Sequence, residues 1–139
     1  MSELRRGTWR RRGQAAVEFA LVLPFLLVML VGIIEFGRAW NEHQVITDAA
    51  REAARKGAIY DESVTKADIE KVANDALAAA GINPSTATIT LDNWDGDAGE
   101  KLTVSIDLPY TFTIFGPLVR WSTGQSNIVL KTSFSMRNE

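Results

Sequence analysis

The chain has 139 residues, of which 46% are hydrophobic, and a formal net charge of −2 at pH 7. It contains no cysteine and a single histidine, His43, which leaves few candidates for zinc binding, thiol catalysis or a Ser-His-Asp triad. Because it also lacks a glycine-rich phosphate loop and a GxSxG motif, the sequence predicts neither an enzyme nor a cofactor-binding protein.

Charge is distributed unevenly along the chain. Residues 1–13 carry five arginines and one acid, so residues 14–139 hold the remaining ten of 15 basic side chains and sixteen of 17 acidic ones. So short a basic segment on an acidic chain argues against nucleic acid as a partner. Positive residues stay on the cytoplasmic side of a membrane segment, so we predict an N-terminus inside and a C-terminal part outside.

An uncharged apolar run extends from Phe19 to Ile34. As a helix it would cover roughly 24 Å of a ~30 Å hydrocarbon core, and residues 14–18 bring it to spanning length. A buried core helix is disfavoured because no helical face is polar, and a cleaved secretory signal because residues 32–37 match a cleavage site poorly. We predict a retained transmembrane helix over residues 14–35. Pro24 either bends or locally unwinds this helix or is simply tolerated there, as in many membrane helices.

One carboxylate, Glu18, lies inside the start of the apolar segment. An ionised side chain in hydrocarbon costs about 2.5 kcal/mol or more. Glu18 therefore either lies near the membrane interface of a plain anchor or has a partner that neutralises it.

Two motifs at matching spacing carry a resemblance to a known family. Residues 12–24 (RGQAAVEFALVLP) and the later segments 35–39 and 49–55 resemble the TadE-like family. These proteins are minor pilins, or pseudopilins, of the tight-adherence (Flp) branch of type IV pili. The resemblance is strong over about the first 57 residues and diffuse after that, where residues 102–112 and 116–118 look like later parts of the family.

The resemblance implies a role for each residue around the start of the apolar segment. Gly13 would end a basic prepilin leader, residues 1–13, which a prepilin peptidase removes on the cytoplasmic side to leave Gln14 first. Glu18 would then be fifth in the mature chain, where pilins pair a glutamate with the N-terminal amine of a neighbouring subunit during assembly. Phe19 stands where this branch usually has tyrosine.

The family also implies partners and a location. The partners would be the prepilin peptidase, other pilins, the pilus assembly platform and the lipid bilayer. The protein would be a single-pass component of the bacterial cytoplasmic (inner) membrane, and would enter an extracellular pilus or stay in the assembly machine. The alternative is an uncleaved membrane-anchored module whose extracytoplasmic domain binds an envelope or surface partner, with Gly13 an incidental linker residue.

The helical pattern continues past the apolar run and predicts one helix from about Gln14 to Lys56, with Gly57 as its C-cap. Trp40 lies just past the membrane segment, where aromatic rings favour the interface. A patch of small residues either contacts a neighbouring helix or packs on the chain's own domain, and we favour the second; it consists of Ala49, Ala50, Ala53 and Ala54.

The remaining sequence predicts a small domain. A capping box at residues 65–68 starts a second helix that reaches about Ala80. Alternating apolar residues then predict strands at residues 88–91, 102–108 and 128–136, with a further strand over residues 110–115 set off by a bulge or edge at Pro109.

The predicted fold class is therefore α+β. A long N-terminal transmembrane helix continues to about residue 57 and enters a small extracytoplasmic domain, residues 36–139. This domain would hold the second helix and a three- to four-stranded antiparallel sheet, whose apolar face packs on the outer half of the first helix.

Two segments of this domain are candidate sites. Residues 92–100 are rich in Asp and Gly, but they lack the spacing of a calcium loop, and a hairpin connection explains them, so no metal site is predicted. Residues 115–121 are unusually apolar for a loop. They either form a contact surface for a neighbouring subunit or fold Phe115 and Trp121 back onto the sheet.

Overall fold

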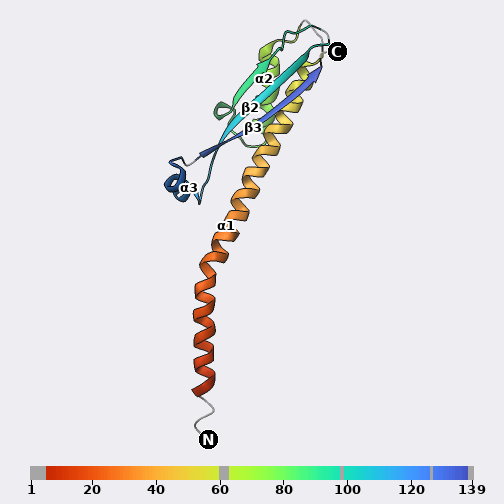
Figure 1. Ribbon diagram of the computed structural model, residues 1–139. Coiled ribbons are helices and arrows are strands. Elements are labelled where there is room, and N and C mark those ends of the chain that lie inside the picture. The colour runs from red at the N-terminus through yellow and green to blue at the C-terminus, as the bar shows by residue number, and fades with distance from the viewer. Residues whose placement is uncertain (1–5, 60–62, 98, 126, 138–139) are drawn as a thin grey trace. The chain divides into compact units, whose positions relative to one another are not determined.

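The computed structural model describes residues 6–59, 63–97, 99–125 and 127–137. It contains a long apolar N-terminal helix, a second helix and a three-stranded antiparallel sheet, which confirms the α+β class (Figure 1). The elements in chain order are α1 (Arg6–Gly57), α2 (Lys66–Ala79), the 3-10 helix η1 (Pro84–Thr86), β1 (Thr88–Asp92), β2 (Lys101–Thr111), α3 (Gly116–Thr123) and β3 (Asn127–Arg137).

The chain divides into two compact units, Met1–Phe36 and Gly37–Glu139, here called the N-terminal and the C-terminal unit. Within the described part of the N-terminal unit, α1 begins at Arg6 rather than near Gln14 as predicted. The helix extends further because arginine is a good helix former and Gly13 alone costs only about 1 kcal/mol. The helical assignment also continues across Pro24.

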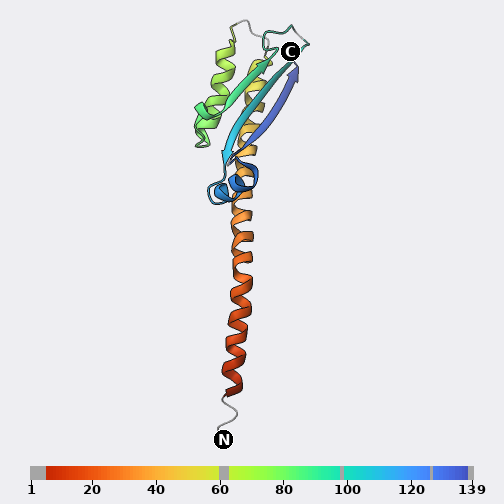
Figure 2. The same cartoon turned by 60° about the vertical axis from the view of Figure 1, so that its left-hand side comes forward.

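The C-terminal unit is built on a sheet with strand order β1-β2-β3, in which both pairs are antiparallel. Alternate residues of β2 are buried, from Leu102 to Tyr110, so one face of the sheet is covered. The last part of α1 and the whole of α2 lie against this face (Figure 1, Figure 2). The buried core consists of Ile46, Ala49, Ala50, Ala53, Ala54, Ile69, Ala73, Leu77, Leu91, Leu102, Val104, Ile106 and Leu108.

The small-residue patch of α1 lies at the centre of this core. Ala49, Ala50, Ala53 and Ala54 are each at most 1% exposed. The favoured prediction, that these alanines pack on the chain's own domain, is confirmed. Small side chains allow the helix backbone to come close to the sheet, which explains their run at helical spacing.

The capping box predicted for α2 is confirmed. The Thr65 hydroxyl accepts a hydrogen bond from the Asp68 backbone N–H at 3.3 Å, and the Thr65 N–H donates to Asp68 Oδ2 at 2.9 Å. The helix ends at Ala79, one residue before the predicted end, and Gly81 follows with a left-handed φ of 79°. This backbone reversal is the one that favours glycine after a helix.

The prediction of a separate strand over residues 110–115 is wrong, and among the described residues the sheet has three strands, the lower of the two predicted numbers. β2 continues through Pro109, which pairs with Val129, as far as Thr111. The missing N–H is tolerated here because β1 pairs with β2 only up to Asp107, so Pro109 lies where β2 has a neighbour on one side. Residues 116–123 form α3, because Pro117 suits a first helical turn and Gly124, at φ 77°, caps the end.

β3 alternates less cleanly than β2, and Thr132 shows why. It occupies an inward position between the half-buried residues Leu130 and Phe134. Its hydroxyl lies 3.2 Å from the hydroxyl of Thr47 on α1, so the polar atom is satisfied inside the interface.

Candidate functional site

The residues predicted to act in processing and assembly all lie on α1 in the N-terminal unit. Gly13, Gln14, Glu18, Phe19 and Pro24 are all exposed. Gln14 Nε2 donates a hydrogen bond to Glu18 Oε1 at 3.0 Å across one helical turn. The structure therefore brings Gln14 and Glu18 together, with Gly13 directly before them, while Pro24 lies about 9 Å further along the helix axis.

The helix that carries these residues is apolar and exposed along its length. Its most apolar 18-residue window has a mean hydropathy of 2.7, and 0% of that window is buried. The alternative of a buried core helix therefore fails. A signal sequence near an N-terminus would pass the same test of length and composition as α1. By length and composition, α1 is the one helix among the described residues that could cross a membrane.

Among the described side chains, no cation forms an ion pair with Glu18. Its hydrogen-bond donor, the side chain of Gln14, is a neutral amide. A carboxylate has about four lone-pair sites, so it can accept an ammonium group in addition to this amide. The exposed position of Glu18 leaves room for such a group from outside the chain.

A second acid at the other end of the apolar run received no role from the sequence. Glu35 is only 2% exposed. The sequence feature that could have drawn attention to Glu35 is its position directly after Ile34, the last residue of the uncharged run. A carboxylate is almost never buried unless it is paired, so Glu35 marks this boundary as a structured position.

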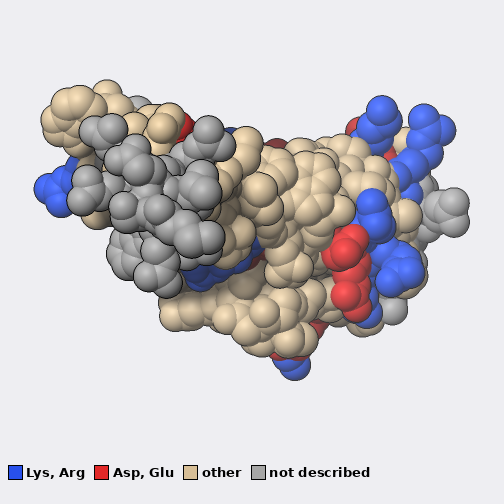
Figure 3. Space-filling model, turned by 90° about the horizontal axis from the view of Figure 1, so that it is seen from below, with Lys and Arg blue, Asp and Glu red and all other residues tan. Residues whose placement is uncertain are grey.

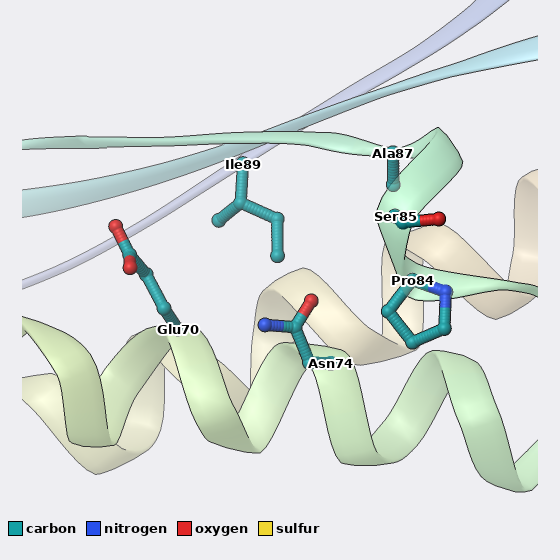
Figure 4. A pocket seen from close by; sticks show the side chains of 6 residues that line it. All are labelled: Glu70, Asn74, Pro84, Ser85, Ala87 and Ile89. Atoms are coloured by element: carbon teal, nitrogen blue, oxygen red, sulfur yellow. The ribbon is translucent and has the colours of Figure 1, made fainter.

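A broad hollow lies between α2 and the η1–β1 segment of the C-terminal unit. Its volume is about 450 Å³, and Glu70 and Asn74 project from α2 toward it (Figure 4). Glu70 pairs with Lys66 at 3.7 Å, and the Ser85 hydroxyl donates to Asn83 Oδ1 at 2.9 Å. The hydroxyl of Ser85 is thus bonded to a neutral amide, whereas an activated serine nucleophile would be bonded to a base.

The Asp/Gly-rich segment forms a turn between β1 and β2. Asn93 adopts a left-handed φ of 58°, and its side-chain amide donates to Glu100 Oε2 at 2.9 Å. Within the described ranges, no group of three or more His, Cys, Asp or Glu side chains could hold a metal ion. Internal hydrogen bonding between Asn93 and Glu100 therefore organises this turn.

Charged side chains of the C-terminal unit are mixed in sign. Arg51 Nη1 lies 3.1 Å from Asp48 Oδ1, and its guanidinium also lies over the Phe134 ring at 5.3 Å. In the view of Figure 3, basic and acidic groups gather mainly on one side, while uncharged residues fill most of the remaining described surface. Basic and acidic groups therefore lie beside each other where charges gather among the described residues of this view.

The apolar segment over residues 115–121 is the remaining candidate. Trp121 is 85% exposed, so of the two alternatives the one in which its ring folds back onto the sheet does not hold. Phe115 is half-buried and precedes α3. An exposed tryptophan on a short helix leaves an apolar surface facing outward.

Comparison with known proteins bears on the N-terminal site. Residues 13–55 match the family model described as TadE-like protein. Over this stretch the chain is TadE-like. The match begins at Gly13 and covers the apolar helix and the part of α1 that carries the buried alanines, so the resemblance seen in the sequence is confirmed. The TadE-like family is pilus-associated and non-catalytic, and it belongs to the Tad pilus system.

The match ends before the other elements of the C-terminal unit. The second helix, the sheet and α3 all lie outside residues 13–55. No curated protein and no solved structure gives a significant match to the chain. The TadE-like assignment therefore rests on α1, and the roles of the other elements must be argued from their own chemistry.

Proposed function

We propose that this TadE-like protein is a minor pilin, or pseudopilin, of a tight-adherence (Flp-type) pilus. It is inserted with its N-terminus inside, cut after Gly13 and assembled through its N-terminal helix. The observation that carries the proposal is the position of Glu18, one turn after Gln14 on a helix whose apolar side chains are exposed.

The exposed apolar helix requires a nonaqueous environment. Large side chains from Val17 to Ile34 are exposed, with values such as 76% for Phe25 and 67% for Met29. Lipid would cover them in a membrane, and neighbouring helices would cover them in a fibre. Assembly then exchanges one apolar environment for the other, so packing and polar pairing decide its direction.

Cleavage after Gly13 would create the partner that Glu18 lacks. A new α-amino group at Gln14 would be largely protonated at neutral pH, since such groups titrate near pH 7.7–8.0. An ammonium from a neighbouring subunit could then reach the exposed carboxylate and neutralise it in a low-dielectric setting. Processing would thereby switch on an interaction that the precursor cannot make.

Removal of the carboxylate tests this mechanism in cells that assemble the pilus. We expect Glu18→Ala to be inserted and processed normally but to enter pili or assembly complexes poorly, because the ion pair is lost. Glu52→Ala, which removes an exposed carboxylate elsewhere on α1, is the matched control and should behave as the unmodified protein. Normal incorporation of Glu18→Ala would exclude the proposed pair as a driving force.

One observation favours a second function, an uncleaved membrane-anchored binding module. Gly13 lies inside α1, which extends back to Arg6 without interruption. Because proteases cut extended, accessible backbone, the helix would have to unwind locally before cleavage. In this alternative the helix at Gly13 persists, and the C-terminal unit binds an envelope or surface partner.

A further inference from the structure

An exposed apolar surface surrounds α3 at one end of the sheet. We define the α3 surface by Ile114, Arg120, Trp121, Ile128 and Val129. Its apolar side chains are exposed: Ile114 by 56%, Trp121 by 85%, Ile128 by 40% and Val129 by 50%. Since Thr111 of β2 pairs with Asn127 of β3, both ends of the α3 connection leave the sheet at the same end of these two strands.

Two contacts show how α1 runs along β3 within the C-terminal unit. Arg51 lies over Phe134, and Thr47 meets Thr132. The two α1 positions are about 6 Å apart along the helix and the two β3 positions about 7 Å apart along the strand, so the elements run side by side in the same direction. The beginning of β3, and with it α3, therefore lies toward the N-terminal side of this part of α1.

A hydrogen bond fixes the α3 surface to the first turn of the C-terminal unit. Arg38 Nη1 donates to Thr113 Oγ1 at 3.0 Å, and Ile114 is the next residue in the chain. Arg38 is four residues after Ile34, so the Cα atoms of these two residues lie within about 14 Å of each other for any backbone conformation. Because this limit follows from chain length, it holds for every arrangement of the two units.

Charge distinguishes the two ends of the sheet. Residues 108–130, which contain α3 and the start of β3, include no Asp or Glu, but they include Arg120. The turn at the opposite end, residues 92–100, carries four acids. A membrane–water interface favours a surface that combines tryptophan, aliphatic residues and arginine and that lacks acidic residues. Anionic lipid headgroups would repel the acidic turn.

We propose that the α3 surface lies in the headgroup region of the bilayer that α1 spans, and so gives the C-terminal unit a second attachment to the membrane. This inference rests on the membrane anchor in the proposed function, but not on cleavage after Gly13. Trp121 enters the interface, and Arg120 pairs with lipid phosphates. Trp40, which is 57% exposed on α1, belongs to the same interfacial belt.

The absence of native cysteine allows a direct test in the full chain. Single-cysteine variants carry an environment-sensitive fluorophore at Ser122→Cys on α3, Asp97→Cys at the acidic end, or Leu27→Cys in the apolar run. Each is reconstituted at low protein density into phosphatidylcholine–phosphatidylglycerol vesicles. Nitroxide lipids labelled at the headgroup or at mid-chain then quench the fluorophore according to its depth.

We expect headgroup nitroxide to quench the label at position 122 strongly and the label at position 97 weakly. Adding Trp121→Ser to the Ser122→Cys variant should reduce the quenching at 122, whereas Ile59→Ser, at an exposed aliphatic residue after α1, should leave it unchanged. Equal circular dichroism spectra and melting curves among the variants exclude unfolding as the cause of any difference.

Two results would overturn the inference. Equally weak quenching by headgroup nitroxide at positions 122 and 97 would place α3 in water. Protection of position 122 that grows with protein density, without lipid quenching, would mean that a second copy of the chain covers the surface. Quenching of the label at Leu27→Cys by mid-chain nitroxide distinguishes failure of the α3 attachment from failure of the membrane anchor. If this quenching persists, only the α3 attachment fails. If it is lost, the membrane anchor in the proposed function fails as well.

Discussion

Replacing Gly57 with alanine should destabilise the C-terminal unit, although the same change usually stabilises a helix. A Cβ atom at Gly57 would lie 2.4 Å from Leu102 Cδ2 and 2.7 Å from Ile69 Cδ1. Carbon atoms prefer separations of about 3.5–4.0 Å, so both side chains would have to withdraw by about 1 Å. Leu102 and Ile69 are at most 1% exposed, so they have little space to do so.

The magnitude follows from two opposing effects. Overpacking a buried site costs about 1–3 kcal/mol, whereas exchanging glycine for alanine in a helix returns up to about 1 kcal/mol. With a mid-range overpacking cost of about 2 kcal/mol and a gain of about 1 kcal/mol, the net loss is about 1 kcal/mol. For a unit of this size it corresponds to a melting temperature lower by about 4–8 °C.

The assay is thermal unfolding of the full protein in detergent micelles, followed by near-ultraviolet circular dichroism. Trp94 packs against the core and reports on its tertiary order. Gly37→Ala is the matched control, because nothing lies within 4 Å of a Cβ at that position. It should leave the melting temperature unchanged or raise it. A Gly57→Ala protein at least as stable as the unmodified chain would refute the packing of Leu102 and Ile69 against the end of α1.

Two further predictions concern the capping box of α2. Thr65→Ala should lower the free energy of unfolding by about 1 kcal/mol, measured by urea titration, because the hydroxyl that accepts from the Asp68 N–H and donates to Asp68 Oδ2 is lost; an unchanged unfolding midpoint would argue against the cap. Hydrogen bonds from the side chain and then the backbone of Thr65 lower the pKa of Asp68 below its usual value. A lowered carboxyl pKa gives stability that is present above the unfolded-state value, about 3.9, and is lost as pH falls through the folded-state pKa. Asp68→Asn should therefore flatten the loss of stability below about pH 4, and equal acid sensitivity in both proteins would contradict this.

Regular elements could be predicted where local chemistry and long-range packing agree. The capping box at Thr65, the alternation along β2 and the buried alanines of α1 all carry their signal in residue spacing. The N-terminal boundary of α1 could not be predicted, because the leader-like residues before Gly13 contain no signal that forbids a helix.

Features that depend on partners distant in sequence were not predictable. Pro109 was expected to mark a bulge or an edge before a further strand. β2 instead runs through it, and the end of β1 leaves β2 with one neighbour at that point, which is a property of the register. Gly57 was predicted as a C-cap, yet it ends α1 without a positive φ, and its real constraint is the space taken by Leu102 and Ile69. Thr132 likewise breaks the strand pattern because of Thr47, which lies 85 positions away.

The candidate site divides in the same way. The proximity of Gln14 and Glu18 follows from helical spacing and could be foreseen. The exposure of Trp121 could not, because it depends on how segments of the C-terminal unit that are distant in sequence come together.

The measurement that tests the central proposal most directly is the N-terminal residue and intact mass of the protein isolated from native membranes. Cells with an active prepilin peptidase are required, and a peptidase-deficient strain is the control. The proposal predicts a chain that begins at Gln14 in the first strain and an unprocessed chain in the second. A chain still beginning at Met1 or Ser2 in both strains would contradict pilin processing and favour the uncleaved membrane-anchored binding module.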